Sequence, residues 1–549
     1  MFKPKELFIR GYSIPLSDSN LFNLEDPEDQ SIVACPQPPI EAVKAGKAVS
    51  VPSGEFDISV ILEQLPNSFQ PEIVNLSARN MNFIPRGLER IKCPKVMKIG
   101  DTFHWSDGSL KGIIQYCQTL QCDYHWVYQG VQHLHFFVEA GLKNVFWLPG
   151  TPVIEHYIPQ NKESKSYDII FRGSQSELHV HRSRLVKFLQ NSKVNIDIQS
   201  KPYIECLEDY ANSRIAFNCG LNGDTNRRVF EVMMAGGFLL TDRLSSQSGL
   251  FSLFQEGVHL ECYENEGELL HKIKFYLKNP DKAEKIAAAG HQKLIDCYSQ
   301  QTVRQKFYRY ILEGKIEPPF LLEHDKRVLY INRNGDHKKF SIRLQVYELI
   351  QEIHRLNPQI KLLYWKGVNQ EMVSDLADLP RLDITYFNLK EAVIEMEAWC
   401  SKVGVKDQVH LEYLPSLQKF QIVLLDLPDT LAAIKQLLLE VEPKIANSGF
   451  LLIVGDTKRQ TKRILNLLAR LRGFIPVSLC VAGSQQPLGV GACFVYQKLA
   501  RGGQVSQEST PKLFVNKLSL KAKVRMQLRS LPLVRQAKKF VKSFLLKKS

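Results

Sequence analysis

Two arginines and a glutamate stand together in the stretch NRRVFEVMMAGGFLLTD, residues 226–242. Asn226 is a favourable N-cap residue, so the apolar helix that follows it begins with Arg227 and Arg228. Each cation beside a helix N-terminus is unfavourable by about 0.3–1 kcal/mol. Because free backbone N–H groups and arginine side chains both bind phosphate, this arrangement is typical of an anion site.

Glu231 lies one turn further along the same predicted helix. Its carboxylate cannot bind phosphate, but it accepts hydrogen bonds from sugar hydroxyls. Phosphate at the helix start and hydroxyls at Glu231 together indicate a nucleotide or a nucleotide sugar. The alternative is structural: the arginines make surface salt bridges, and Glu231 pairs with one of them. These residues alone leave both interpretations open.

Alternating strands and helices must position this stretch. From about residue 55 the pattern predicts two Rossmann-like α/β units with parallel sheets, separated by a polar linker at 156–167. The predicted strands cover 71–78, 94–101, 124–130, 144–150, 168–174, 194–200, 214–220, 237–242 and 257–263. A helix over 301–314 closes the second unit. Residues 1–50 are rich in turn residues and predict a loosely structured lead-in.

A third α/β unit is predicted after residue 325. Its strands cover 327–332, 360–365, 382–387, 409–414, 420–427 and 450–456, and it ends near residue 499.

The opening stretch continues into a longer pattern that resembles a known family. Arg228, Phe230 and Glu231 form R-x-F-E, a strand ends in Thr241-Asp242, and GELLHKIKFYLKNP follows. Upstream lie DIIFRGSQSELHVHRSRLVKFL and HFFVEAGLKNVFWLPG. In this order the pieces resemble GT-B glycosyltransferases of the CgeB-like, group 1 type, over roughly residues 55–315.

This resemblance implies an α/β fold with two Rossmann-like domains facing a cleft. We expect an acceptor-side domain over 1–160, a nucleotide-sugar domain over 161–320, a third Rossmann-like domain over 325–500, and a linker with a basic helical tail over 501–549. The implied activity is hexosyltransferase-like: a sugar moves from a nucleoside-diphosphate sugar to an acceptor hydroxyl. The implied acceptor is a glycan, a lipid-linked sugar or a protein, in surface glycan or glycoconjugate synthesis.

The family's donor contacts carry over to matching positions. Glu231 would hold the ribose hydroxyls, and Arg228 would lie near the diphosphate. The remaining implied donor-binding residues are Asn226, Arg227, Gly173, Ser174 and Arg182. For Arg182 and its neighbour Arg184 the alternative is a solvated helix face.

One position departs from the family. Many retaining GT-B enzymes have a second glutamate eight positions before the one at Glu231, where this chain has Gly223 beside Asp224. Retention or inversion of the anomeric centre therefore stays open. GT-A enzymes hold a divalent cation with Asp-x-Asp, which this chain lacks, so we expect no metal and no cofactor.

The predicted acceptor half offers KIGDTFHWSDGSL, residues 98–110. It follows a strand and so lies at the carboxyl edge of the sheet, where open α/β sheets bind ligands. Asp101, His104 and Asp107 are candidate general bases for an acceptor hydroxyl. The alternative is that Asp101 caps a helix and His104 is simply exposed. We expect His133 and His135 to be structural.

Part of the third unit is similar to class I methyltransferases over residues 380–456. Its loops lack the glycine-rich turn that lets the backbone approach the cofactor, and Asn388 stands where an acidic residue would hold the ribose. We interpret the unit as a degenerate, non-catalytic module. Two alternatives to glycosyl transfer remain: an inactive glycosyltransferase-like scaffold and, less favoured, a methyltransferase with a glycosyltransferase-like partner domain.

The net charge of +14 is concentrated at the end of the chain, since residues 501–549 carry thirteen Lys/Arg and one Glu. Pro532 splits this tail, and Ala537, Phe540, Val541, Phe544 and Leu545 recur at helical spacing after it. A basic amphipathic helix fits an anionic membrane surface better than nucleic acid, and a disordered tail is the alternative. Eleven cysteines without C-x-x-C, no signal peptide and no membrane-length apolar run predict a cytoplasmic protein, peripheral on the inner face of the membrane through residues 512–549.

Overall fold

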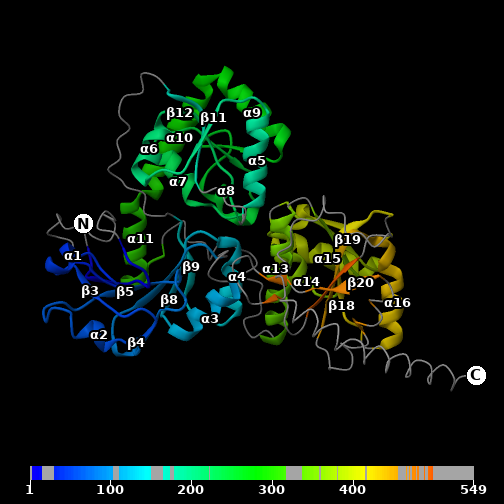
Figure 1. Ribbon diagram of the computed structural model, residues 1–549, viewed down its shortest axis with the longest axis horizontal. Helices are drawn as coiled ribbons and strands as arrows, with labels where there is room; N and C mark the ends of the chain where they lie inside the picture. Colours follow the sequence, from blue (N-terminus) through cyan, green and yellow to red (C-terminus); the bar gives the residue numbers. More distant parts are fainter. Residues whose placement is uncertain are drawn as a thin grey trace, which may run out of the picture.

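The computed structural model describes residues 3–14, 30–102, 110–149, 165–173, 179–221, 223–316, 337–357, 360–379, 381–414, 417–428, 430–455 and short stretches between 465 and 498. Within these ranges the chain forms three α/β domains, each built around its own largely parallel sheet (Figure 1). The predicted class, two Rossmann-like domains followed by a third, is confirmed. In this part of the chain no helix is long and apolar enough to cross a membrane.

The first domain has a seven-stranded parallel sheet with the order β3-β2-β1-β5-β7-β8-β9. Its strands are β1 (Glu6–Ile9), β2 (Ile32–Cys35), β3 (Ala48–Ser50), β5 (Ile73–Ser77), β7 (Lys95–Ile99), β8 (Tyr124–Val127) and β9 (Val145–Trp147). Its helices are α1 (Ile40–Lys44), α2 (Ser59–Leu62), α3 (Leu110–Leu120) and α4 (Leu134–Glu139), and the short strands β4 (Glu55–Asp57) and β6 (Ile84–Arg86) form a separate pair.

The prediction of a loosely structured lead-in over residues 1–50 is wrong. Strand β1 lies in the interior of the sheet, between β2 and β5, and all four of its residues are buried. Its first residue, Glu6, is charged, so the sequence does not show a fully apolar strand here. Glu6 accepts hydrogen bonds from the Asn75 amide and from the Tyr308 hydroxyl, both at 2.5 Å, and Tyr308 is 302 positions away.

The second domain has a five-stranded parallel sheet with the order β11-β10-β12-β13-β14. Its strands are β10 (Tyr167–Arg172), β11 (Ile196–Gln199), β12 (Ser213–Phe217), β13 (Leu239–Asp242) and β14 (Glu261–Tyr263). Its helices are α5 (Val180–Asn191), α6 (Tyr203–Ala211), α7 (Arg227–Met234), α8 (Leu250–Leu253), α9 (Glu266–Lys278) and α10 (Pro280–Tyr298). The connections from β10 and β12 leave in opposite directions, so the switch point of the sheet lies between these two strands.

Helix α11 (Gln300–Glu313) corrects the predicted boundary between the first two domains. It was expected to close the second unit, but the helix lies beside the sheet of the first domain (Figure 1). Its apolar side chains pack in the core of that domain, against Trp126 and Phe146. The side chains that α11 contributes are Val303, Phe307, Tyr308, Tyr310 and Ile311. Helical spacing shows that such a stripe is buried, but it cannot show which sheet covers it.

The third domain has a seven-stranded sheet with the order β17-β16-β15-β18-β19-β23-β20, in which β23 runs antiparallel to β19 and β20. Its strands are β15 (Lys361–Trp365), β16 (Asp383–Phe387), β17 (Val409–Glu412), β18 (Phe420–Asp426), β19 (Ile445–Val454), β20 (Phe474–Pro476) and β23 (Cys493–Lys498), with a small pair of β21 (Leu479–Cys480) and β22 (Pro487–Leu488). Its helices are α13 (His337–Leu356), α14 (Gln370–Ala377), α15 (Lys390–Val403) and α16 (Leu431–Val441). The strand expected at 327–332 and the tail 501–549 lie outside the described residues.

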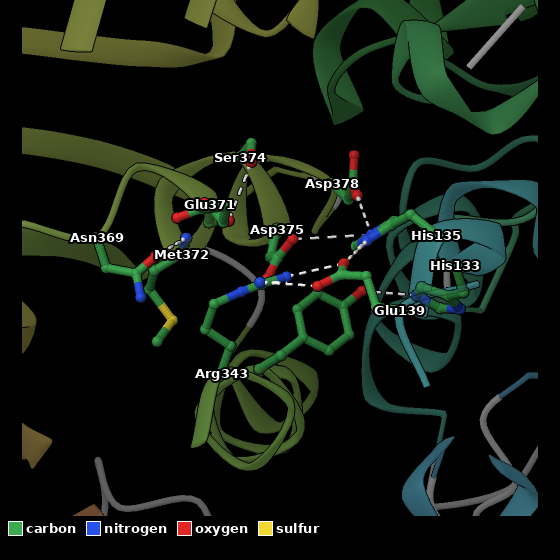
Figure 2. Close-up of polar contacts among 11 residues, drawn as sticks. His133, His135, Glu139, Arg343, Asn369, Glu371, Met372, Ser374, Asp375 and Asp378 are labelled. Atoms are coloured by element: carbon green, nitrogen blue, oxygen red, sulfur yellow. Dashed lines mark hydrogen bonds and ion pairs between the residues drawn. The ribbon is translucent and has the colours of Figure 1, made fainter. Parts of the chain in front are cut away.

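Buried charges join the third domain to the first (Figure 2). The Arg343 guanidinium on α13 bonds both oxygens of Glu139 on α4, at 2.8 and 3.0 Å, and the Asp375 carboxylate on α14 at 2.9 Å. The His135 ring lies 2.9 Å from Glu139, and the His133 ring lies 2.6 Å from the Tyr347 hydroxyl. Both histidines are fully buried in this interface, which agrees with the expected structural role.

Candidate functional site

The candidate donor site lies at the carboxyl edge of the second sheet, at its switch point. Gly173 follows β10, and the loop 218–226 joins β12 to α7. Open parallel sheets bind ligands at this position because the two loops leave it in opposite directions. Asn226 directly precedes α7, as expected, but its side chain exchanges hydrogen bonds of 3.2 Å with Asn218 and does not cap the helix.

Arg228 reaches from α7 across the switch point to the end of β10. Its Nη1 donates to the Asn218 side-chain oxygen at 2.7 Å, and its guanidinium stacks 4.6 Å from the centre of the Phe171 ring. A side chain at Gly173 would overlap that guanidinium, so glycine is required for this close approach. The hydrogen bond goes to a neutral amide, and the nearby charge of Arg228 also opposes the rise that burial causes in the Glu231 pKa.

Arg182 approaches the same loop from α5. It is buried, and its Nη2 donates to the Cys219 carbonyl at 3.0 Å. Burial, together with the positive charge of Arg228, lowers the Arg182 pKa to about 10. The solvated-face alternative is therefore wrong for Arg182. It fits Arg184, which is about one-third exposed and pairs with Glu266 at 3.0 Å.

Glu231 and Arg227 form an ion pair, with 2.6 Å between Nε and Oε1. This is the pairing that the structural alternative expects, and Arg227 also stacks over the Tyr203 ring. Burial raises the Glu231 pKa, and only 12% of its side chain is exposed. A carboxylate has about four acceptor positions, so one arginine does not use all of them.

The departure from the family pattern lies in the same loop. Gly223 has a φ of 73°, a conformation that favours glycine, and Asp224 beside it is buried. Thr225 donates to the Ser248 carbonyl at 3.0 Å.

Asp242 and Arg381 belong to the site but were not predicted. Asp242 ends β13, and its Oδ1 accepts the Gly220 N–H at 2.9 Å. Its Oδ2 accepts from Nη2 of Arg381, at 2.8 Å. Asp242 was visible in the sequence as the end of a strand. Nothing in a linear pattern connects it with Arg381, which lies 139 positions later in another domain.

On the acceptor side, Asp101 follows β7 and is exposed. Burial, with the nearby Asp101, raises the Tyr128 pKa to about 12, and Arg227 of the second domain opposes that shift. Asp101 and Arg227 therefore act on the same tyrosine from two domains. His104, Asp107 and Ser174 lie outside the described residues.

The carboxyl edge of the third sheet is filled by its own side chains. The Asn388 amide donates to the Gly367 carbonyl at 3.0 Å, and the Tyr364 hydroxyl donates to Asp426 at 2.8 Å. A side chain at Gly367 would overlap the Tyr364 ring. This packing agrees with the interpretation of a degenerate module. Among the described residues, no group of three or more His, Cys, Asp or Glu side chains could hold a metal ion.

Comparison with known protein families finds a match that lies mainly in the second domain. A family model described as glycosyl transferase-like matches residues 162–307. Comparison with curated proteins finds no match.

Solved structures show a distant likeness. The chain is similar to Anabaena HepE in complex with UDP and glucose, at 11% identity and a TM-score of 0.40, over 57% of this chain and 100% of that one. For the sucrose-phosphate synthase of Thermosynechococcus elongatus the values are 9%, 0.40, 57% and 100%. For a SAM-dependent O-methyltransferase of Thermotoga maritima they are 14%, 0.23, 29% and 66%. The glycosyl transferase-like match therefore covers the second domain and the start of α11.

Proposed function

We propose that the protein transfers a sugar from a nucleoside-diphosphate sugar to an acceptor hydroxyl. One observation carries the proposal: in the glycosyl transferase-like domain, Arg182 and Arg228 come from two helices and meet at the loop after β12, at the switch point. Two guanidinium groups that converge on one loop at a sheet switch point favour an anionic ligand. A diphosphate supplies negative charge to both guanidinium groups.

The proposed donor contacts follow from this placement. The diphosphate lies beside Arg228 and Gly173, with Arg182 as the second cation. Glu231 holds the ribose hydroxyls with the acceptor positions that Arg227 does not use. The two arginines supply the positive charge that a metal supplies elsewhere, so we propose that no metal is required.

The acceptor hydroxyl loses its proton to a base in the first domain, for which Asp101, His104 and Asp107 are the candidates. The acceptor is a glycan, a lipid-linked sugar or a protein. The basic tail holds the protein at an anionic membrane surface on the cytoplasmic side.

A binding screen tests this function. We expect the thermal midpoint of the full chain to rise with at least one of UDP, GDP, ADP and dTDP, and the matching sugar nucleotides to be hydrolysed slowly. Arg228→Ala removes the shift. Arg214→Ala is the control, because Arg214 is a half-exposed residue of β12 with a surface partner, Asp168. If no nucleoside diphosphate shifts the wild type, the proposal fails.

An inactive scaffold is the second candidate. It is favoured by Gly223 and by the Arg227–Glu231 ion pair, which together remove one family carboxylate and occupy part of the other. Nucleotide binding without hydrolysis or transfer would support the scaffold.

A further inference from the structure

Three consecutive residues of the loop after β12 are each held by a different side chain. Asn218 bonds Arg228, the Cys219 carbonyl bonds Arg182, and the Gly220 N–H bonds Asp242. The position of this loop therefore sets where both arginines point. Asp242 is the only one of these three side chains that brings a negative charge.

Asp242 is almost completely buried, at 1% exposure, so its charge needs a partner. That partner is Arg381, which lies two residues before β16 of the third domain. Arg182 is close enough for the Asp242 charge to act on its pKa. Without Arg381, Arg182 of the donor site is a cation that the Asp242 charge still reaches.

The third domain holds Arg381 in an uncommon conformation. Its φ is 65°, in the left-handed region that residues other than glycine rarely adopt. The His354 ring of α13 is hydrogen-bonded to the Arg381 backbone. Strained backbone persists where the surroundings fix it, and such positions cluster at functional sites.

We propose that the third domain completes the donor site, with Arg381 as a positioning residue. Arg381 neutralises Asp242, so that Asp242 fixes Gly220 without drawing Arg182 or Arg228 away from a diphosphate. This inference rests on the proposed function of the second domain. It gives the methyltransferase-like module a role that requires no methyl transfer.

A double-mutant cycle in the full chain tests the route through Asp242. Binding of the nucleoside diphosphate found in the screen is measured by calorimetry for wild type, Arg381→Ala, Asp242→Asn and the double variant. We expect Arg381→Ala to weaken binding about tenfold or more, a typical coupling between charged neighbours. The amide introduced by Asp242→Asn still accepts the Gly220 N–H but carries no charge, so Arg381→Ala should change little in that background.

Arg184→Ala is the matched control, because Arg184 and Arg381 line the same cavity between the second and third domains but Arg184 pairs with Glu266. It should change binding less than about twofold, the scale of additivity for independent sites.

Wild-type affinity in a folded Arg381→Ala protein overturns the inference, and so does an equal loss in Arg184→Ala. If Arg381→Ala does not fold, a folded double variant that binds like Asp242→Asn supports the inference, and one that binds much more weakly contradicts it. A wild type that binds no nucleoside diphosphate removes the proposed function as well, whereas normal wild-type binding with no effect of Arg381 removes only this inference.

Discussion

At the scale of single residues, substitution can separate two roles of Glu231: the proposed contact with the ribose hydroxyls and the ion pair with Arg227. We expect Glu231→Ala to abolish transfer and to weaken nucleotide binding while the fold survives. Loss of hydrogen bonds to a charged acceptor costs about 1.5–3 kcal/mol, or roughly ten- to a hundredfold in affinity. Arg227 loses its partner but is 44% exposed, so water can solvate it. Calorimetry with the nucleoside diphosphate and an activity assay make the measurement.

Glu231→Gln is the control for this experiment, because it keeps one acceptor and the shape of the side chain. A Glu231→Ala protein with full activity would exclude a ribose contact. A protein that fails to fold would favour the purely structural pairing with Arg227.

Arg228 predicts a kinetic asymmetry between the two substrates. In Arg228→Ala the KM for the sugar nucleotide should rise by about tenfold or more, while the KM for the acceptor changes little, because the lost contact is with the diphosphate. Steady-state kinetics with each substrate varied in turn measures both values. Equal increases in the two KM values would argue against a diphosphate contact.

Among the site residues, those that the βα pattern of one domain places could be predicted, and those brought together by packing between domains could not. Gly173 follows the end of β10, and Asn226 and Arg228 stand at the start of the helix after β12, so the pattern puts all three at the switch point. Arg381 faces Asp242 only because the third domain packs on the second, and no local pattern encodes this packing.

At the scale of elements, local sequence patterns again predict the strands and helices but not how they pack between domains. The alternation of strands and helices predicted the sheets of the second and third domains, since buried parallel strands give continuous apolar runs. Strand β1 was missed because it is only four residues long and begins with a charged residue, Glu6. The packing partner of α11 was missed because an apolar stripe shows that a helix is buried but not which sheet covers it.

The contact between α13, α14 and α4 predicts a large loss of stability when Arg343 is removed. Arg343→Met leaves Glu139 and Asp375 as buried carboxylates, and breaking such a pair costs about 3–5 kcal/mol. The first unfolding midpoint in scanning calorimetry should fall clearly. Arg86→Met is the control in the first domain, because its salt bridge with Glu55 is half exposed and contributes little to stability.

The wild-type interface should also weaken in acid. Burial alone would raise the Glu139 pKa, but the His135 hydrogen bond and the Arg343 charge outweigh it and lower that pKa to about 2. The stabilisation from Glu139 is present above the ordinary glutamate pKa of about 4.3 and is lost as the pH falls from there toward 2. Burial raises the pKa of Asp375 in the same network, so protonation of Asp375 offsets part of this loss. If Arg343→Met destabilised the protein equally at neutral and at strongly acid pH, ion pairs would not be what stabilises this interface.

At the scale of the whole molecule, the positive charge and the proposed catalytic site lie in different parts of the chain. The first 500 residues are nearly neutral, with +2 of the +14, and the remaining +12 lies in 501–549, outside the described residues. A basic segment with apolar residues at helical spacing gains about 1 kcal/mol for each Lys or Arg near an anionic lipid surface. It would therefore hold the glycosyl transferase-like domain close to lipid-linked acceptors.

Flotation with liposomes measures this contribution. The full chain should float with anionic liposomes at low salt, less at high salt, and not with neutral liposomes, because the attraction is electrostatic and is screened. A chain lacking residues 505–549 should stay at the bottom. The third domain exposes Val368, Leu389, Leu414 and Leu417 in loops that follow β15, β16 and β17, so the folded part has an apolar edge of its own. Equal flotation of the truncated chain would assign membrane binding to the folded part, and no flotation of the full chain with anionic liposomes would exclude a membrane role for the tail.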